Sequence, residues 1–115
     1  MVIDLSERTD AWMPVIERTN DVLAAKCHLT MRWDVSGTGG NCTALVSTGH
    51  GFEVLVTRDE EPSLPAAPDP HETYTVGIYD GATSHLIDQI EHQVLITIPL
   101  AVQTLIENAT RRNPA

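Results

Sequence analysis

Two different periods of apolar residues divide the chain. Between residues 10 and 26, apolar side chains recur every three or four positions, which predicts a helix with one side on the core. Pro14 falls in the first turn of this helix, where its missing N–H costs little. A helix that began as early as Ser6 would instead hold Pro14 in its interior and bend there.

Alternation of apolar and polar residues follows, and it predicts strands. The alternating segments are residues 29–35, 42–48, 52–58 and 73–79. Glycine-containing turns at 37–41 and 49–51 join the first three, so we expect an antiparallel meander with the fourth segment as a further member. The turn at 37–41 leads into a strand and has no lysine, so we interpret it as a hairpin turn and not as a phosphate-binding loop. In the second strand, Cys42 is expected to point inward.

Residues 59–72 interrupt the alternation with four prolines and five acidic residues. This composition is typical of an extended, exposed and mobile connector. Too little chain lies on either side of it for two cores, so residues 1–115 are expected to form a single domain.

The last third of the chain has two interpretations. One is a long helix over residues 85–110 that Pro99 kinks. The other is a helix to Gln93, a short strand over 94–98 and a second helix with Pro99 in its first turn. We favour the kinked helix, because no Gly or Asn turn signal separates the pieces.

Together these patterns predict an α+β fold. It has an N-terminal helix, an antiparallel three- or four-stranded meander sheet, and a long kinked or broken C-terminal helix. Both helices are expected on one face of the sheet, because the strands alternate between an apolar and a polar side.

The net charge of the chain restricts the classes of partner that it can bind. Its 16 acidic and 7 basic residues give a formal net charge of -9. Nucleic acid and anionic membranes are poor partners for such a chain, because phosphate groups are bound by Lys and Arg. Between residues 59 and 110 there is no Lys or Arg at all, which fits a basic protein partner, with solubility as the simpler explanation. The acidic residues that we place on such a contact are Asp59, Glu60 and Glu61.

The compartment is expected to be the cytoplasm. The start of the chain does not resemble a secretion signal, and no stretch reaches the roughly 18 apolar residues that span a bilayer. Cys27 and Cys42 are then expected to be reduced thiols, and they lie too far apart to form a CxxC motif.

Chemically active residues are few. On a helix, His85, Asp88 and His92 would lie within one arc, which makes them the candidate ligands of a metal ion. Their spacing is not that of a specific zinc motif, so we assign no metal and no cofactor. His50 lies in a tight turn, but no nucleophile motif accompanies it, so we assign no catalytic residue.

An apolar belt over residues 94–106 covers more than one side of a helix. The sheet can cover one side, and the other needs either the N-terminal helix or a second copy of the chain. We expect a homodimer through this element. The contact residues would be Leu95, Ile98, Val102 and Ile106.

The sequence favours a small acidic, non-enzymatic protein-binding module, such as an accessory, chaperone-like, adaptor or inhibitor protein that acts as a homodimer. Two other classes stay open. One is a small-molecule or metal-binding protein, or an enzyme, with a pocket between sheet and helices. The other is a structural or assembly component of a larger particle.

Overall fold

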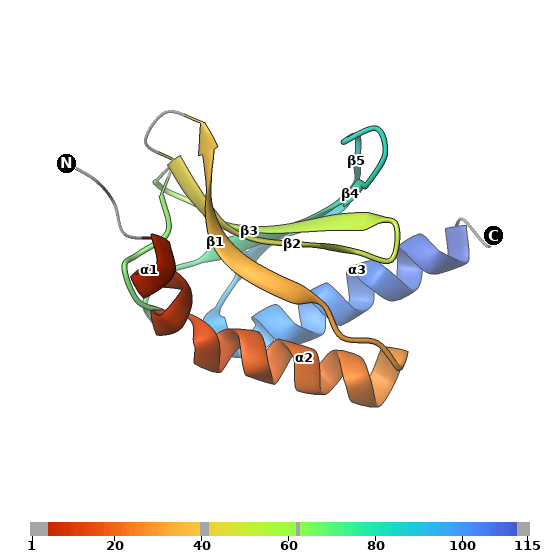
Figure 1. Ribbon diagram of the computed structural model, residues 1–115, viewed down its shortest axis with the longest axis horizontal. Helices are drawn as coiled ribbons and strands as arrows, with labels where there is room; N and C mark the ends of the chain where they lie inside the picture. The colour runs from red at the N-terminus through yellow and green to blue at the C-terminus, as the bar shows by residue number, and fades with distance from the viewer. Residues whose placement is uncertain (1–4, 40–41, 62, 113–115) are drawn as a thin grey trace.

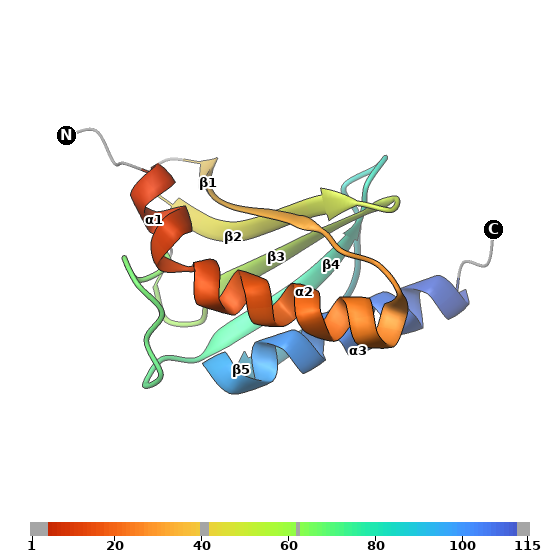
Figure 2. The ribbon, with the colours of Figure 1, turned by 60° about the horizontal axis from the view of Figure 1, so that its bottom comes forward.

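The computed structural model describes residues 5–39, 42–61 and 63–112. Its elements in chain order are α1 (Leu5–Ala11), α2 (Met13–Cys27), β1 (Arg32–Gly39), β2 (Cys42–Gly49), β3 (Phe52–Arg58), β4 (Tyr74–Asp80), β5 (Leu86–Gln93), the 3-10 helix η1 (Leu95–Thr97) and α3 (Ile98–Arg112). The strands form one antiparallel sheet in the order β1-β2-β3-β4-β5. Figures 1 and 2 show α2 and α3 together on one face of it. The predicted α+β fold is confirmed, with five strands in place of three or four.

The N-terminal helix is divided at Trp12. α1 ends at Ala11 and α2 begins at Met13, so Pro14 lies in the first turn of α2, where it costs no helical hydrogen bond. Trp12 itself is fully buried, and its ring meets the ring of Tyr74 edge-on with 5.7 Å between the centroids. This break lets α1 pack on β1 while α2 packs on α3.

The segment predicted to begin the C-terminal helix is instead the edge strand β5. Two irregularities in its register with β4 each add one residue to β5. Such bulges shift the alternation of side chains, so that Ile87 and Ile90 come three positions apart, as on a helix. Both interpretations that place a helix at residue 85 are therefore wrong over β5.

The C-terminal helix α3 begins at Ile98, with Pro99 in its first turn, as the second interpretation predicts. The 3-10 helix η1 precedes it where that interpretation places a short strand. α3 packs against β4 and β5 and also against α2. Its buried residues are Ile98, Pro99, Ala101, Val102, Leu105, Ile106 and Ala109.

The register of β2 differs from the prediction. Leu45 pairs with Val56, and Ser47 pairs with Val54, across the two central strands. Directly opposed residues share a face, so Leu45 and Ser47 face the core together with the two valines. Cys42 belongs to the alternate positions of β2, and the expectation that it points inward is wrong.

The acidic, proline-rich segment 59–72 is exposed only in part. Leu64 is 2% exposed and belongs to the core. Its backbone N–H donates to Thr43 Oγ1 at 3.1 Å, and its carbonyl accepts from the Arg8 guanidinium at 3.3 Å. Trp12 Nε1 donates to the carbonyl of Pro65 at 3.1 Å. The segment is thus tied to α1 and β2, while residue 62, like residues 40–41 of the predicted hairpin turn, lies outside the described residues.

Side chains of the N-terminal helices hold the start and the middle of the edge strand β1. Asn20 Oδ1 accepts from the Met31 N–H at 3.0 Å and from Trp33 Nε1 at 3.2 Å, and Asn20 Nδ2 donates to the Met31 carbonyl at 2.9 Å, so the residue just before β1 is tied to α2. Thr9 Oγ1 accepts from the Val35 N–H at 3.0 Å. Together with the packing of α1 on β1, this bond occupies part of the edge that another strand could otherwise pair with.

The Asn20→Ala variant is expected to lose about 2–3 kcal/mol of unfolding free energy, because three hydrogen bonds are lost and the Met31 N–H is left without its acceptor. Urea unfolding monitored by circular dichroism measures the loss. The adjacent exposed residue gives the control: Asp21→Ala is expected to stay within about 0.5 kcal/mol. Equal losses in the two variants would contradict the role given to Asn20.

Candidate functional site

Three of the four large apolar side chains that are exposed in the described residues lie close together in the sequence, where β5 ends and α3 begins. Ile96 is 71% exposed, Leu100 is 56% exposed and Val94 is 37% exposed. Ile96 and Leu100 are four positions apart and so lie on the same side of the helical segment. We call Val94, Ile96 and Leu100 the apolar corner. Leu86, which is also exposed, lies at the opposite end of β5.

The apolar residues that the sequence placed on a partner contact lie elsewhere. Ile98, Val102 and Ile106 are buried in the core of their own chain, and Leu95 packs partly buried against that core. The reason is that α2 covers the side of α3 that β4 and β5 leave free. These side chains are therefore not presented to another molecule, and the exposed apolar surface is the corner beside them.

Sequence reasoning missed the corner because it left the start of the helix undecided. Once α3 begins at Ile98, Leu100 falls on the side that also carries the exposed Thr104 and Arg111. The polar residues farther along the helix are thus the signal that marks Leu100 as outward. A helix that ran through Pro99 from residue 85 gave no fixed starting point for that count.

The neighbours Ile96 and Ile98 are expected to respond in opposite ways to the same substitution. Ile98→Asp buries an unpaired carboxylate and is expected to cost about 4 kcal/mol or more, enough to unfold a domain of ordinary stability. Ile96→Asp is expected to change the unfolding free energy by less than about 0.5 kcal/mol, because its side chain is in water. Denaturant unfolding of both variants checks this. Similar losses would contradict the placement of the corner at the surface.

The acidic residues predicted to meet a partner follow β3, at the end of the sheet where β5 also ends. Arg58 pairs with Tyr74 and Tyr74 pairs with Gln93 across the ladder, so the residues after Arg58 and those after Gln93 leave the sheet at the same end (Figure 1). His92 Nδ1 lies 3.6 Å from Asp59 Oδ2 and joins the two segments. The structure thus brings the predicted acidic set Asp59, Glu60 and Glu61 to the end of the sheet that carries the apolar corner.

Arg58 organises the carboxylates at this end. Its guanidinium donates to Glu72 Oε1 at 2.6 Å and to Glu61 Oε2 at 2.9 Å. The hydrogen bond from Arg58 holds the pKa of Glu72 below its ordinary value. Asp59 accepts from the Thr75 hydroxyl at 2.5 Å through Oδ1, while its buried Oδ2 has no hydrogen-bond partner. The arrangement fixes the first turn of the segment 59–72 against β4.

Glu72→Gln is expected to lower the melting temperature at pH 7, because the charge-assisted bond to Arg58 is lost. The pKa of Glu72 is lower in the folded chain than in the unfolded chain, so its contribution is complete above the unfolded value and disappears as the pH falls through the folded value. The gap between wild type and variant should therefore begin to narrow as the pH falls below the unfolded value, which is about 4.3. Thermal unfolding from pH 7 to pH 3 measures it. A gap that stays constant would contradict the assignment.

The candidate metal ligands do not share a helix face, because their segment is a strand. His85 lies in the connection before β5, and Asp88 is opposite Ile78 on β4. His92 has a positive φ of 58° and lies at the bulge near the end of β5, between Ile90 and Gln93. Within residues 5–39, 42–61 and 63–112, no group of three or more His, Cys, Asp or Glu side chains is arranged to hold a metal ion.

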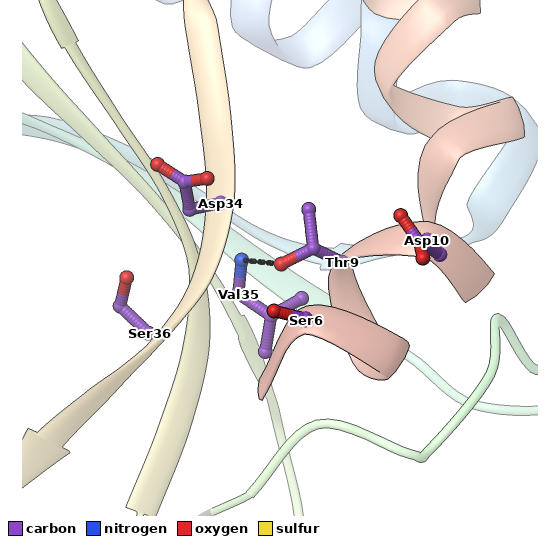
Figure 3. A pocket seen from close by; sticks show the side chains of 6 residues that line it. All are labelled: Ser6, Thr9, Asp10, Asp34, Val35 and Ser36. Carbon is purple, nitrogen blue, oxygen red and sulfur yellow. Dashed lines mark hydrogen bonds between the residues drawn. The ribbon is translucent and has the colours of Figure 1, made fainter. Parts of the chain in front are cut away.

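A shallow pocket of about 350 Å³ lies between α1 and β1 (Figure 3). It is lined by Ser6, Thr9, Asp10, Asp34, Val35 and Ser36. The lining supplies oxygen atoms and has neither an imidazole nor a thiol. Thr9 already accepts from the Val35 N–H, as the dashed line in Figure 3 marks. None of the residues that the sequence marked for a small-molecule site lies here.

Two side chains that resemble nucleophiles, Ser47 and Cys27, have structural contacts. Ser47 is 1% exposed and donates to the Arg32 carbonyl at 2.6 Å. The Cys27 thiol donates to Glu107 Oε1 at 3.9 Å, and burial, followed by the Glu107 charge, raises the pKa of Cys27. A thiol with a raised pKa is a weak nucleophile at neutral pH. His50 lies in the β2–β3 turn, and its Nε2 is 3.2 Å from the carbonyl of Thr30, which precedes β1.

In the part of the chain that the structure describes, no helix is both long and apolar enough to cross a membrane. Comparison with known protein families, with curated proteins and with solved structures finds no match to this chain. The functional argument therefore rests on the geometry of its own residues.

Proposed function

We propose that the protein is a non-enzymatic protein-binding module whose contact surface is the apolar corner. The observation that carries this proposal is the exposure of Val94, Ile96 and Leu100 within seven consecutive residues. Apolar side chains in water cost free energy that a partner recovers by covering them. The core does not need these three, because α3 buries another set of residues.

The chemistry of the other side chains supports a binding role. The buried hydroxyl of Ser47 and the protonated thiol of Cys27 are both held in hydrogen bonds inside the fold. The pocket between α1 and β1 is polar and shallow, and its lining contains no nitrogen base. A contact between two protein surfaces requires none of these groups.

The homodimer expected from the sequence stays a prediction, but the argument for it has changed. It rested on an apolar side of the C-terminal helix that needed a cover, and α2 of the same chain provides that cover. A second copy could contact the apolar corner, but not the buried side chains of Ile98, Val102 or Ile106. We therefore propose a different protein as the partner.

The double variant Ile96→Asp with Leu100→Asp is expected to lose the partner. Tagged wild-type protein, the double variant and the control Thr104→Asp, which adds a charge to the same outward side of α3, are used to capture proteins from a lysate of the source organism. A protein retained by wild type and control should be depleted at least about tenfold with the double variant.

The same three proteins are compared by sedimentation velocity. Wild type alone is expected to sediment as a monomer of 12.6 kDa. A wild-type dimer that the double variant dissociates would mean that a second copy occupies the corner. Identical captured proteins in all three samples would rule out the corner as the contact surface.

A further inference from the structure

The apolar corner lies beside a strongly acidic part of the molecule. Gln93 ends β5 and Arg58 ends β3, and both are paired with Tyr74 on β4. Val94 and Ile96 follow Gln93, just as Glu60 follows Arg58. His92 Nδ1 lies 3.6 Å from Asp59 Oδ2, so the two segments are in contact. A partner that covers the corner therefore meets the carboxylates of this end.

Arg58 neutralises only part of the negative charge of these carboxylates. Arg58 is bound by Glu61 and Glu72, and its own side chain is only 16% exposed. Glu60 and Glu91 are exposed to solvent, and the side chain of Glu61 remains 61% exposed despite its contact with Arg58. The sequence adds no Lys or Arg between residues 59 and 110. The corner therefore has a rim of negative potential, which attracts cationic groups and repels anionic ones.

Charge separates the two occupants that the corner could have. A second copy would bring the acidic rims of two chains, each with a net charge of -9, toward one another. A segment with apolar residues flanked by Lys or Arg would instead fill the corner and meet the rim with opposite charge. From this complementarity we infer that the occupant is a basic amphipathic segment of another protein. This inference rests on the proposed function and specifies its partner.

Each part of the surface has a separate task in this contact. Ile96 and Leu100 supply the apolar anchor, because they are the most exposed of the large apolar residues on the corner. Glu60 and Glu91 supply the long-range attraction, which raises the association rate and weakens as salt increases. The two contributions can therefore be removed one at a time.

The probe is a fluorescein-labelled helical peptide with leucines on one face and lysines on the other, titrated with the full chain by fluorescence anisotropy. Wild type is expected to bind it, and more weakly at high salt. Ile96→Ser with Leu100→Ser keeps the charge and is expected to weaken binding at least about tenfold. Glu60→Gln with Glu91→Gln is expected to weaken binding several-fold at low salt and much less at high salt.

The matched control is Glu17→Gln with Asp21→Asn, which makes the same change in net charge at exposed positions on α2. Its affinity should equal that of wild type, and circular dichroism should show that every variant is folded. A control that weakens binding as much as Glu60→Gln with Glu91→Gln would overturn the inference, since overall charge would then explain the binding. Failure of wild type to bind the probe would also overturn it.

A second peptide with the same leucines and with glutamates in place of lysines separates this inference from the proposed function. Equal affinity for both peptides, lost in Ile96→Ser with Leu100→Ser, would overturn the basic partner and leave the corner as a protein-binding surface. A wild-type dimer that this variant dissociates would overturn it in favour of a second copy. Strong preference for the lysine peptide, with the control unchanged, supports it.

Discussion

The core depends on the burial of α3 from two directions. β4 and β5 cover one side of this helix, and α2 covers another. Ile98 and Val102 have no exposed surface, and full burial of such side chains contributes roughly 1.5–3 kcal/mol each. A helix that lies on a sheet without a neighbouring helix needs a single apolar stripe. A helix covered on two sides needs a wider one, and this explains why residues 94–106 carry more apolar side chains than one sheet face can cover. Packing within one chain thus accounts for the buried residues of the belt, whereas Val94, Ile96 and Leu100 remain exposed.

Much of the fold could be predicted where the local period is undisturbed. Trp33 and Val35 alternate with polar residues, and both are buried as the alternation requires. Val54 and Val56 are buried as well, on the side of β3 opposite to Leu55. The spacing of apolar residues was misleading in β5, because two bulges place them three positions apart, as on a helix. The inward side of β2 could not be read from its own residues either. It is set by the pairing of Leu45 with Val56, which is a contact between strands and leaves no trace in a single segment.

The sequence pointed to the acidic residues of the candidate site but not to its exposed apolar residues. Composition alone located the acidic residues Asp59, Glu60 and Glu61, because charge needs no knowledge of geometry. The exposure of Ile96 and Leu100 depends on how α3 is rotated about its axis, and that rotation depends on where β5 ends and the helix begins. Because β5 was predicted to be a helix, the rotation of the following helix was wrong as well, and exposed and buried positions on it were exchanged. The apolar residues that the sequence predicted for the contact are thus close neighbours of the exposed ones, but their side chains are buried or partly buried in the core.

The contact of α1 with β1 also bears on how the chain reaches its folded state. Until α1 is in place, β1 is an uncovered sheet edge, and such edges join to those of other chains when protein is concentrated. Docking of α1 then competes with aggregation, and the faster of the two decides the yield of folded protein. α1 precedes β1 in the chain, so it leaves the ribosome before the edge that it covers. The order of elements in the sequence thus acts as a safeguard during synthesis.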